Sequence, residues 1–223
     1  MDGKTAYLAL YLDAPLQSWG YQSRFDQRTT LSYPTRSGVM GILCAALGVD
    51  RSDRGGLGRL SSLEMTVYAL RQSGRLTDYH TVGGGYDVDR DWRTCIPRKA
   101  NGKKPARGKE VVQTYREYLQ DSRFGVVLRG AQQLVQELDA ALVAPRWGVW
   151  LGRKACVPAS PIAQGVYEAE DAAVARLMHV SGCEVVEREV AEASTFADGN
   201  DTLMDMPLDF QERRFAPRRV DVG

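Results

Sequence analysis

The residues best suited to bind an anion open a predicted helix, in the stretch PTRSGVMGILCAALG of residues 34–48. Thr35 or Ser37 can cap this helix, and Ser37 and Gly38 leave backbone N–H groups facing outward. Those groups and the helix dipole favour an anion, and Arg36 adds a full positive charge. The stretch therefore predicts a phosphate site, and an ordinary cap beside a solvated arginine is the alternative.

Two loops carry further residues of the kind that contact RNA. Gln17, Ser18 and Trp19 follow a predicted strand, and the indole of Trp19 is either a surface for base stacking or part of the core. In WLGRKACVP of residues 150–158, a glycine precedes two adjacent cations and makes a second compact basic site: Gly152, Arg153, Lys154.

Catalytic residues are few in this sequence. His80, beside Tyr79, is the candidate general base among the basic elements, and a hydrogen-bonding or stacking histidine is the alternative. The sequence has no G-x-S-x-G, H-E-x-x-H or Walker motif. Four scattered cysteines and two histidines make no zinc pattern, so we expect neither a metal nor a cofactor.

Charge is strongly segregated along a chain whose net charge is only +1. Residues 90–109 contain eight Lys or Arg and one acid, whereas residues 184–212 contain nine acids and one base. Such segregation favours a polyanionic partner for the basic segment, with solvated surface as the alternative for both segments. The acidic segment would repel phosphates, so we expect it to face away from RNA.

Hydrophobic periodicity predicts the elements that position these residues. We expect strands at 7–13, 64–71, 75–82 and around 124–130, helices at 34–48 and 131–144, and strand content near 149–157. Beyond 158 a short helix at 171–179 and a strand at 183–190 are expected. The order predicts an α+β, ferredoxin-like (RRM-like) domain over residues 1–145, with a basic insertion at about 84–112, and a smaller, mostly β extension over 146–223.

The absence of a long apolar run and the scattered thiols indicate a cytoplasmic protein without a membrane span.

Five blocks of the sequence indicate a protein family: LYLDAPLQSWG, YPTRSGVMGILCAALG, LTDYHTVGGG, TYREYLQDSRFGVVL and PRWGVWLGRKACVP. Together they cover about residues 6–160, and they resemble the CasD family, the fifth Cas protein family of type I-E CRISPR surveillance complexes (Cascade).

The resemblance implies a RAMP-superfamily fold whose basic insertion is a thumb that contacts the guide RNA. It implies a non-catalytic subunit for antiviral defence that binds the 5′ handle of the CRISPR RNA and caps one end of the backbone filament. Its partners would be the backbone subunits, the large PAM-recognising subunit and, through the complex, target DNA. The implied RNA-binding residues are Gln17, Ser18, Trp19, Arg36, Ser37, Gly38, His80, Thr81, Val82, Gly83, Arg98, Lys99, Lys103, Lys104, Arg107, Lys109, Arg116, Gly152, Arg153 and Lys154.

Two alternatives to this non-catalytic role stay open from the sequence. A related type I-C branch cuts precursor CRISPR RNA with a Tyr/Lys/His set, which Tyr79, His80 and a thumb lysine could mimic. A generic single-strand RNA chaperone would bind RNA without preference for the handle.

Overall fold

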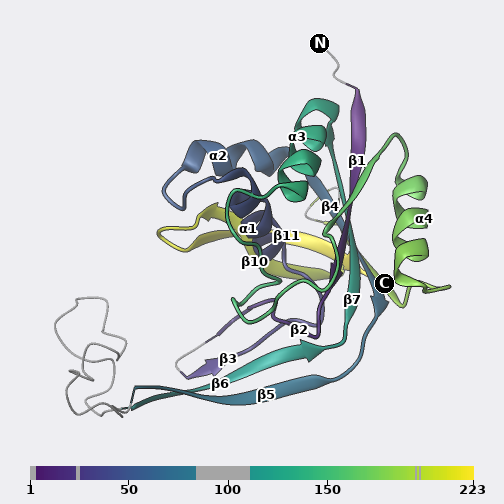
Figure 1. The fold of residues 1–223 in the computed structure, drawn as a ribbon. Coiled ribbons are helices and arrows are strands. Elements are labelled where there is room, and N and C mark those ends of the chain that lie inside the picture. The colour runs from purple at the N-terminus through teal and green to yellow at the C-terminus, as the bar shows by residue number, and fades with distance from the viewer. Residues whose placement is uncertain (1–3, 24–25, 84–110, 194, 196) are drawn as a thin grey trace.

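A seven-stranded antiparallel sheet forms the centre of the computed structural model, which describes residues 4–23, 26–83, 111–193, 195 and 197–223. The sheet has the order β10-β11-β9-β4-β7-β1-β8 (Figure 1). Its strands are β1 (Thr5–Asp13), β4 (Glu64–Arg71), β7 (Arg123–Ala131), β8 (Ala163–Tyr167), β9 (Arg188–Glu192), β10 (Asp201–Asp209) and β11 (Arg214–Val222).

Both faces of this sheet are buried, and β1 shows why. Successive strand residues point to opposite faces, so Leu8, Leu10 and Leu12 enter one core, and Ala9 and Tyr11 enter another. The first core packs on α1 (Arg36–Leu47) and α3 (Gln132–Val143), and the second packs on α4 (Glu170–Ser181). Helix α2 (Arg54–Arg59) and a 3-10 turn (Leu60–Ser62) lead from α1 to β4.

A smaller sheet makes a long arm that leaves the body of the molecule (Figure 1). The strands β5 (Arg75–Gly83) and β6 (Val111–Gln120) pair antiparallel along their length. The short strands β2 (Leu16–Gln17) and β3 (Gln27–Arg28) pair with the other edge of β6, antiparallel and parallel respectively. The insertion at residues 84–110 follows the end of β5 and lies outside the described residues.

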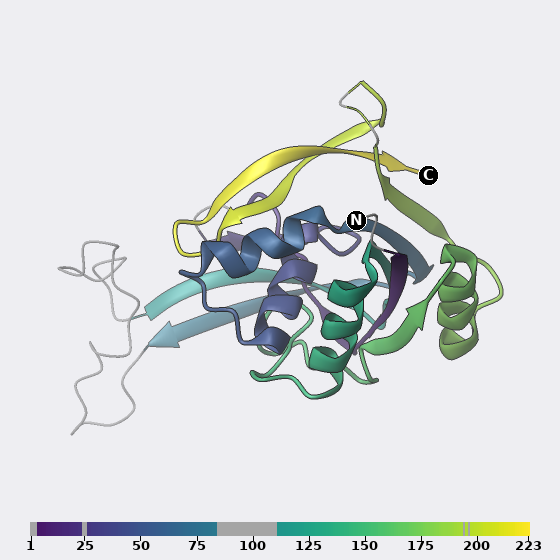
Figure 2. The same ribbon diagram turned by 90° about the horizontal axis from the view of Figure 1, so that it is seen from above.

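The C-terminal residues continue the seven-stranded sheet. Strand β8 pairs with β1, and β9 pairs with β4 and β11. Strands β10 and β11 form a hairpin that curves past α1 and α2 (Figure 2). The expected boundary at residue 145 therefore falls between α3 and β8, and the strands beyond it share a sheet with those before it.

The predicted α+β class is confirmed, and most elements up to residue 144 lie where the periodicity predicts them. The helix at 34–48 is α1, capped by Thr35 and ended by Gly48 in the left-handed conformation at φ 74°. The strand content expected near 149–157 is wrong, because this segment forms turns and the strand lies at Ala163–Tyr167. The strand expected at 183–190 lies at Arg188–Glu192. The elements without a counterpart among the expected ones are α2, the short strands β2 and β3, and the strands β6, β10 and β11.

No helix in the described part of the chain is long and apolar enough to cross a membrane.

Candidate nucleic-acid interface

The N-terminus of α1 holds an anion that comes from the chain itself. The backbone N–H of Arg36 donates to Oδ2 of Asp205 at 2.7 Å, and the N–H of Gly38 donates to Oγ1 of Thr35 at 3.2 Å. A carboxylate at a helix N-terminus satisfies free N–H groups and interacts favourably with the helix dipole. The N–H of Gly38, expected to face a phosphate, is therefore occupied by the cap, and the neighbouring N–H of Arg36 is occupied by Asp205.

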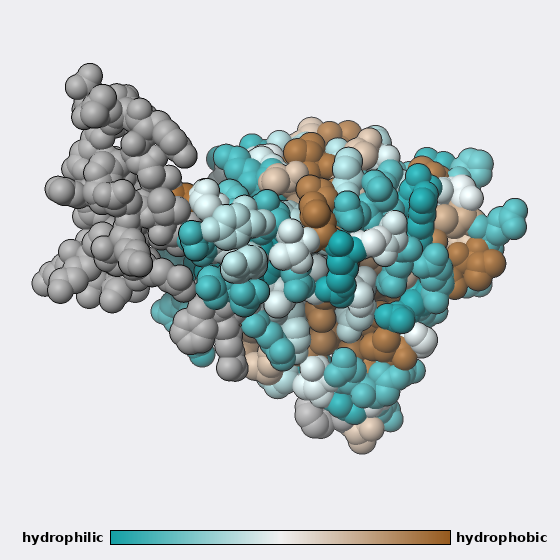
Figure 3. All heavy atoms as spheres, turned by 90° about the horizontal axis from the view of Figure 1, so that it is seen from below, coloured by the Kyte–Doolittle hydropathy of each residue, from teal (hydrophilic) through white to brown (hydrophobic). Residues whose placement is uncertain are grey.

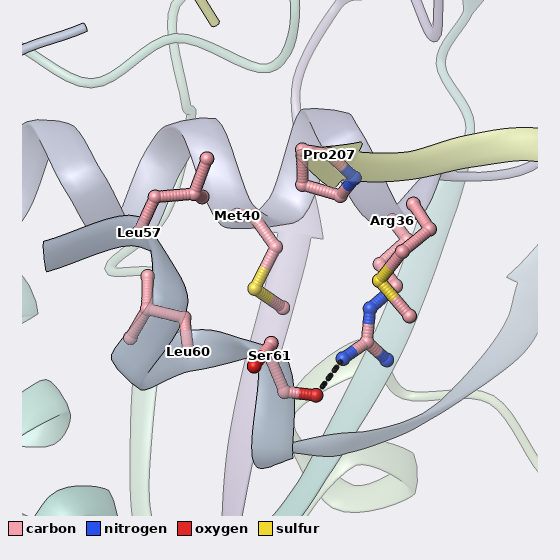
Figure 4. A pocket seen from close by; sticks show the side chains of 7 residues that line it. Arg36, Met40, Leu57, Leu60, Ser61 and Pro207 are labelled. Atoms are coloured by element: carbon pink, nitrogen blue, oxygen red, sulfur yellow. Dashed lines mark hydrogen bonds between the residues drawn. The ribbon is translucent and has the colours of Figure 1, made fainter. Parts of the chain in front are cut away.

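The side chain of Arg36 is a structural arginine, only 1% exposed. Its guanidinium donates to the carbonyl oxygen of Ser61 at 3.2 Å (Figure 4). It also donates to the carbonyl oxygen of Leu63 at 2.6 Å and pairs with Glu192. The expectation of a solvated or phosphate-binding charge at Arg36 is wrong in this structure, because every acceptor it meets is internal. The adjoining pocket leaves essentially no room for a molecule the size of water, so it is too small for a small-molecule site.

The acidic segment supplies the other half of this buried network. Arg218 donates to both carboxylate oxygens of Asp205, from Nε at 2.7 Å and from Nη2 at 3.0 Å, and reaches Glu192 at 3.3 Å. Asp205 is 2% exposed, and Asp209 is also buried against Arg54. The alternative that the acidic segment is wholly solvated surface is therefore wrong, because several of its acids fasten the C-terminal hairpin to α1 and α2.

The loop that follows β1 is also interior. Gln17 is fully buried and donates to the carbonyl oxygens of Leu12 (3.0 Å) and Ser122 (2.6 Å), and it accepts from the indole of Trp19 at 3.2 Å. Trp19 is 0% exposed and packs against Gly38, where an added Cβ would meet the indole at 2.9 Å. Of the two roles that the sequence allowed for Trp19, it is therefore part of the core, and its ring is not available to stack on a base. Ser18 is buried as well, whereas Ser37 is half-buried and contacts Thr35.

The second basic site divides into one structural and one exposed cation. Gly152 has φ 102°, and an added Cβ would lie 1.8 Å from the carbonyl oxygen of Ser18, so its close approach is to protein backbone. Arg153 donates to the carbonyl oxygens of Glu117 (2.6 Å) and Arg28 (2.7 Å) and lies 4.7 Å from the ring centre of Tyr118. Lys154 is exposed, 5.8 Å from the ring centre of Trp150.

The remaining candidates lie on the arm, and the register divides them between its two faces. Residues directly opposite each other on paired strands share a face. The pairs Asp78↔Arg116 and His80↔Thr114 therefore share one face, and Arg28, in register with Arg116, joins them. We call this set the arginine face: Arg28, Asp78, His80, Thr114 and Arg116.

The arginine face combines cations with hydrogen-bonding groups. Nε of Arg116 donates to Oγ1 of Thr114 at 3.1 Å, and Asp78 lies 3.6 Å from Nδ1 of His80. Within the described chain the other guanidinium nitrogens of Arg116 and the guanidinium of Arg28 have no hydrogen-bonding partner. Two half-buried guanidinium groups side by side suit phosphate oxygens, which accept paired N–H donors.

Tyr79 and His80 lie on opposite faces of the arm. Tyr79 is directly opposite Tyr115, and their ring centres are 5.4 Å apart, whereas His80 is opposite Thr114. Adjacent side chains on an extended strand point in opposite directions, so the phenol and the imidazole cannot converge on one RNA bond in this arrangement. The described residues contain no group of three metal-binding side chains.

Sequence reasoning missed Arg28 because its stretch, DQRTT, has no periodicity, and only pairing with a strand some ninety residues later aligns it with Arg116. Of the other expected residues, Thr81 is exposed and Val82 half-buried on β5, which ends at Gly83. The expected thumb residues lie outside the described residues: Arg98, Lys99, Lys103, Lys104, Arg107 and Lys109.

Comparison with known proteins identifies the family. A family model described as CRISPR-associated protein (Cas_Cas5) matches residues 7–221, nearly the whole chain. The chain belongs to the Cas5 family. This Cas5 protein is 34% identical to the CRISPR system Cascade subunit CasD of Escherichia coli (strain K12), over 180 residues that cover 74% of the chain and 73% of the relative.

Solved structures agree with the Cas5 assignment. A chain of a CRISPR RNA-guided surveillance complex is 32% identical, with a TM-score of 0.76, and the match covers 97% of this Cas5 chain and 89% of that chain. A chain from a crystal structure of a Cas protein is 30% identical, with a TM-score of 0.63, and the match covers 97% of this Cas5 chain and 93% of that chain. The resemblance drawn from the five sequence blocks is thereby confirmed.

Proposed function

We propose that this Cas5 protein is a non-catalytic subunit of a Cascade-type complex that binds the 5′ handle of the CRISPR RNA. It would cap one end of the backbone filament and contact the adjacent backbone subunit and the large PAM-recognising subunit, and it would meet target DNA through the complex. The similarity to CasD and to a chain of a surveillance complex supports this role.

The observation that carries the proposal is the alignment of Arg28 and Arg116 on one face of the arm. This face lies at the base of an insertion whose sequence is strongly basic over residues 90–109. Cations that follow one another along a projecting ribbon suit the backbone of a single-stranded RNA. The side chains of Arg36 and Trp19 are buried, so the RNA contacts of this chain would come from the arm and from Lys154 rather than from these two residues.

We further propose that the core is a ferredoxin-like RAMP domain. The elements β1, α1, β4, β7, α3 and β8 follow one another along the chain in the order that this fold requires. Strand β7 lies between β1 and β4, and β8 pairs with the other edge of β1, all antiparallel. On this assignment the arm is an insertion between the second and third core strands.

The test is RNA binding by charge-removal variants of the full chain. Arg28→Ala and Arg116→Ala should each weaken binding to a labelled handle RNA by about 1.5–3 kcal/mol and lower the salt slope by about 0.7 for each phosphate that the variant no longer neutralises. Arg129→Ala removes an exposed arginine on β7, outside the arginine face, and is the matched control. Unchanged affinity and slope in both arm variants would contradict the proposed site.

The non-catalytic assignment has its own test. The separation of Tyr79 from His80 across the ribbon argues against a joint role in cleavage. We expect no cut in repeat RNA with or without magnesium, as judged by denaturing electrophoresis. Specific cleavage that His80→Ala abolishes would establish the endoribonuclease alternative instead.

A further inference from the structure

The face of the arm opposite the arginine face carries an exposed pair of aromatic rings. Tyr79 is 53% exposed and Tyr115 is 40% exposed, and they are directly opposed across β5 and β6. Their ring centres are 5.4 Å apart and the ring planes are tilted by 51°. A cross-strand aromatic pair stabilises a sheet by only about 0.2–1 kcal/mol. This stabilisation does not explain why both rings are exposed to water.

The surroundings of this pair are polar. Thr77, Thr81 and Gln113 share its face by register and are exposed, and Gln27 lies beside Tyr115 on β3. The acid that shares this face by register, Glu117, is paired with Arg75 at 3.4 Å. On the side of the molecule where β5 and β6 lie, hydrophobic residues form small separate groups among hydrophilic ones (Figure 3). A protein partner that docks through an apolar patch has little to bind here.

The two rings also keep their polar atoms available. Neither phenol hydroxyl makes a hydrogen bond to another of the described residues, and both side chains are exposed. The strand β5 pairs with β6 alone among the described strands, so no described strand occupies its outer edge. A flexible strand whose phosphates lie on the arginine face can pass around this edge and place a base against the rings.

We propose that Tyr79 and Tyr115 form a stacking surface for one unpaired base of the bound RNA, a step that rests on the proposed function. Surfaces for single-stranded RNA combine cations that track the backbone with aromatic rings that stack on bases, and the two faces of this arm supply one element each. Stacking tolerates any base because every base has a π-face, so this contact adds affinity and fixes the strand without reading its sequence.

The experiment uses the full chain and handle RNAs that carry 2-aminopurine at one position at a time. Stacking on a tyrosine should quench the probe at one position, or at two neighbouring positions. Tyr79→Ala and Tyr115→Ala should each remove that quenching and weaken binding by roughly 5- to 100-fold. The corresponding Phe variants keep the ring and should retain the quenching, whereas Tyr79→Leu keeps an apolar strand residue without a ring and should lose it. Thr77→Ala, on the same face, is the matched control.

The outcomes separate this inference from the proposed function. If Arg116→Ala weakens binding while the Ala and Leu variants at Tyr79 bind and quench like the parent, the RNA site stands and the stacking surface is wrong. If the tyrosine variants bind RNA normally but fail to co-purify with the backbone subunits, the rings serve a protein contact and the inference is likewise wrong. If the parent chain binds no handle RNA, both proposals fall. Melting curves show whether each variant is folded, and the Phe and Leu variants decide the matter should the Ala variants unfold.

Discussion

The carboxylate of Asp205 accepts a 2.7 Å hydrogen bond from the backbone N–H of Arg36, across 169 residues of sequence. This contact seats the C-terminal hairpin on the N-terminus of α1, and Arg218 holds the same carboxylate from β11. A helix start that has the features of a site for an external phosphate is therefore filled by an internal anion. Its role in this Cas5 protein is to join the C-terminal strands to the core.

Removal of Asp205 should destabilise the protein strongly. Asp205→Ala leaves Glu192 as the only described carboxylate beside the buried guanidinium of Arg218 and removes the acceptor of the Arg36 N–H, and breaking a buried network from one side costs about 3–5 kcal/mol. Asp221→Ala, at an exposed position on β11, should change the free energy of unfolding by less than about 0.5 kcal/mol. Urea denaturation measures both. Equal stability of the two variants would show that the network contributes nothing, and Arg36→Ala should behave like Asp205→Ala.

Two glycines of α1 should respond in opposite directions to the same substitution. Gly38→Ala places a Cβ 2.9 Å from the indole of Trp19 and should cost about 1–3 kcal/mol through overpacking. Gly41→Ala meets nothing within 4 Å and should stabilise the helix by about 0.5–1 kcal/mol. Thermal unfolding of the two variants beside the parent gives the comparison. A rise in Tm for both would mean that Trp19 can move aside.

Arg153 should not be replaceable by lysine. Its planar guanidinium joins the carbonyl oxygens of Glu117 and Arg28, so it fastens β6 and β3 at the base of the arm. Arg153→Lys keeps the charge but cannot span both acceptors, and we expect the free energy of unfolding to fall by about 1–3 kcal/mol. Lys154→Ala, one residue on and exposed, is the control and should weaken RNA binding without a change in stability. Parent-like stability of Arg153→Lys would contradict this role.

Cys44 should resist alkylation in the folded protein. Burial raises the pKa of its thiol to about 11, so at pH 8.5 the reactive thiolate is scarce while the protein is folded. An unfolded cysteine titrates near pH 8.5, so the contribution of this thiol to stability is complete below that pH and is lost as the pH rises towards 11. Iodoacetamide labelling read by peptide mass spectrometry should modify the half-buried Cys183 before Cys44, which should react only after denaturation. Rapid labelling of native Cys44 would refute the assignment.

Local pattern was sufficient for much of the architecture. The apolar stripe of residues 34–48 and the alternation of β1 and β4 report a periodicity that each segment must satisfy by itself, and these elements lie where they are predicted. The five sequence blocks likewise identify the family, because motifs in register carry family resemblance whatever their contacts are. The positions of β9 and β10 are harder to predict, since strands with short apolar runs give a weak periodic signal.

Residue types and local patterns are enough to predict the α+β class, the main helices and strands, the basic insertion and the Cas5 family. Which polar residues are available to a ligand depends on the tertiary contacts. Arg36 and Trp19 have the residue types of an RNA site, yet long-range partners at Asp205, Glu192 and Gly38 bury them. Arg28 has no local pattern, and strand pairing places it beside Arg116. Exposure and pairing depend on segments far apart along the chain, so residue types and local pattern cannot supply them.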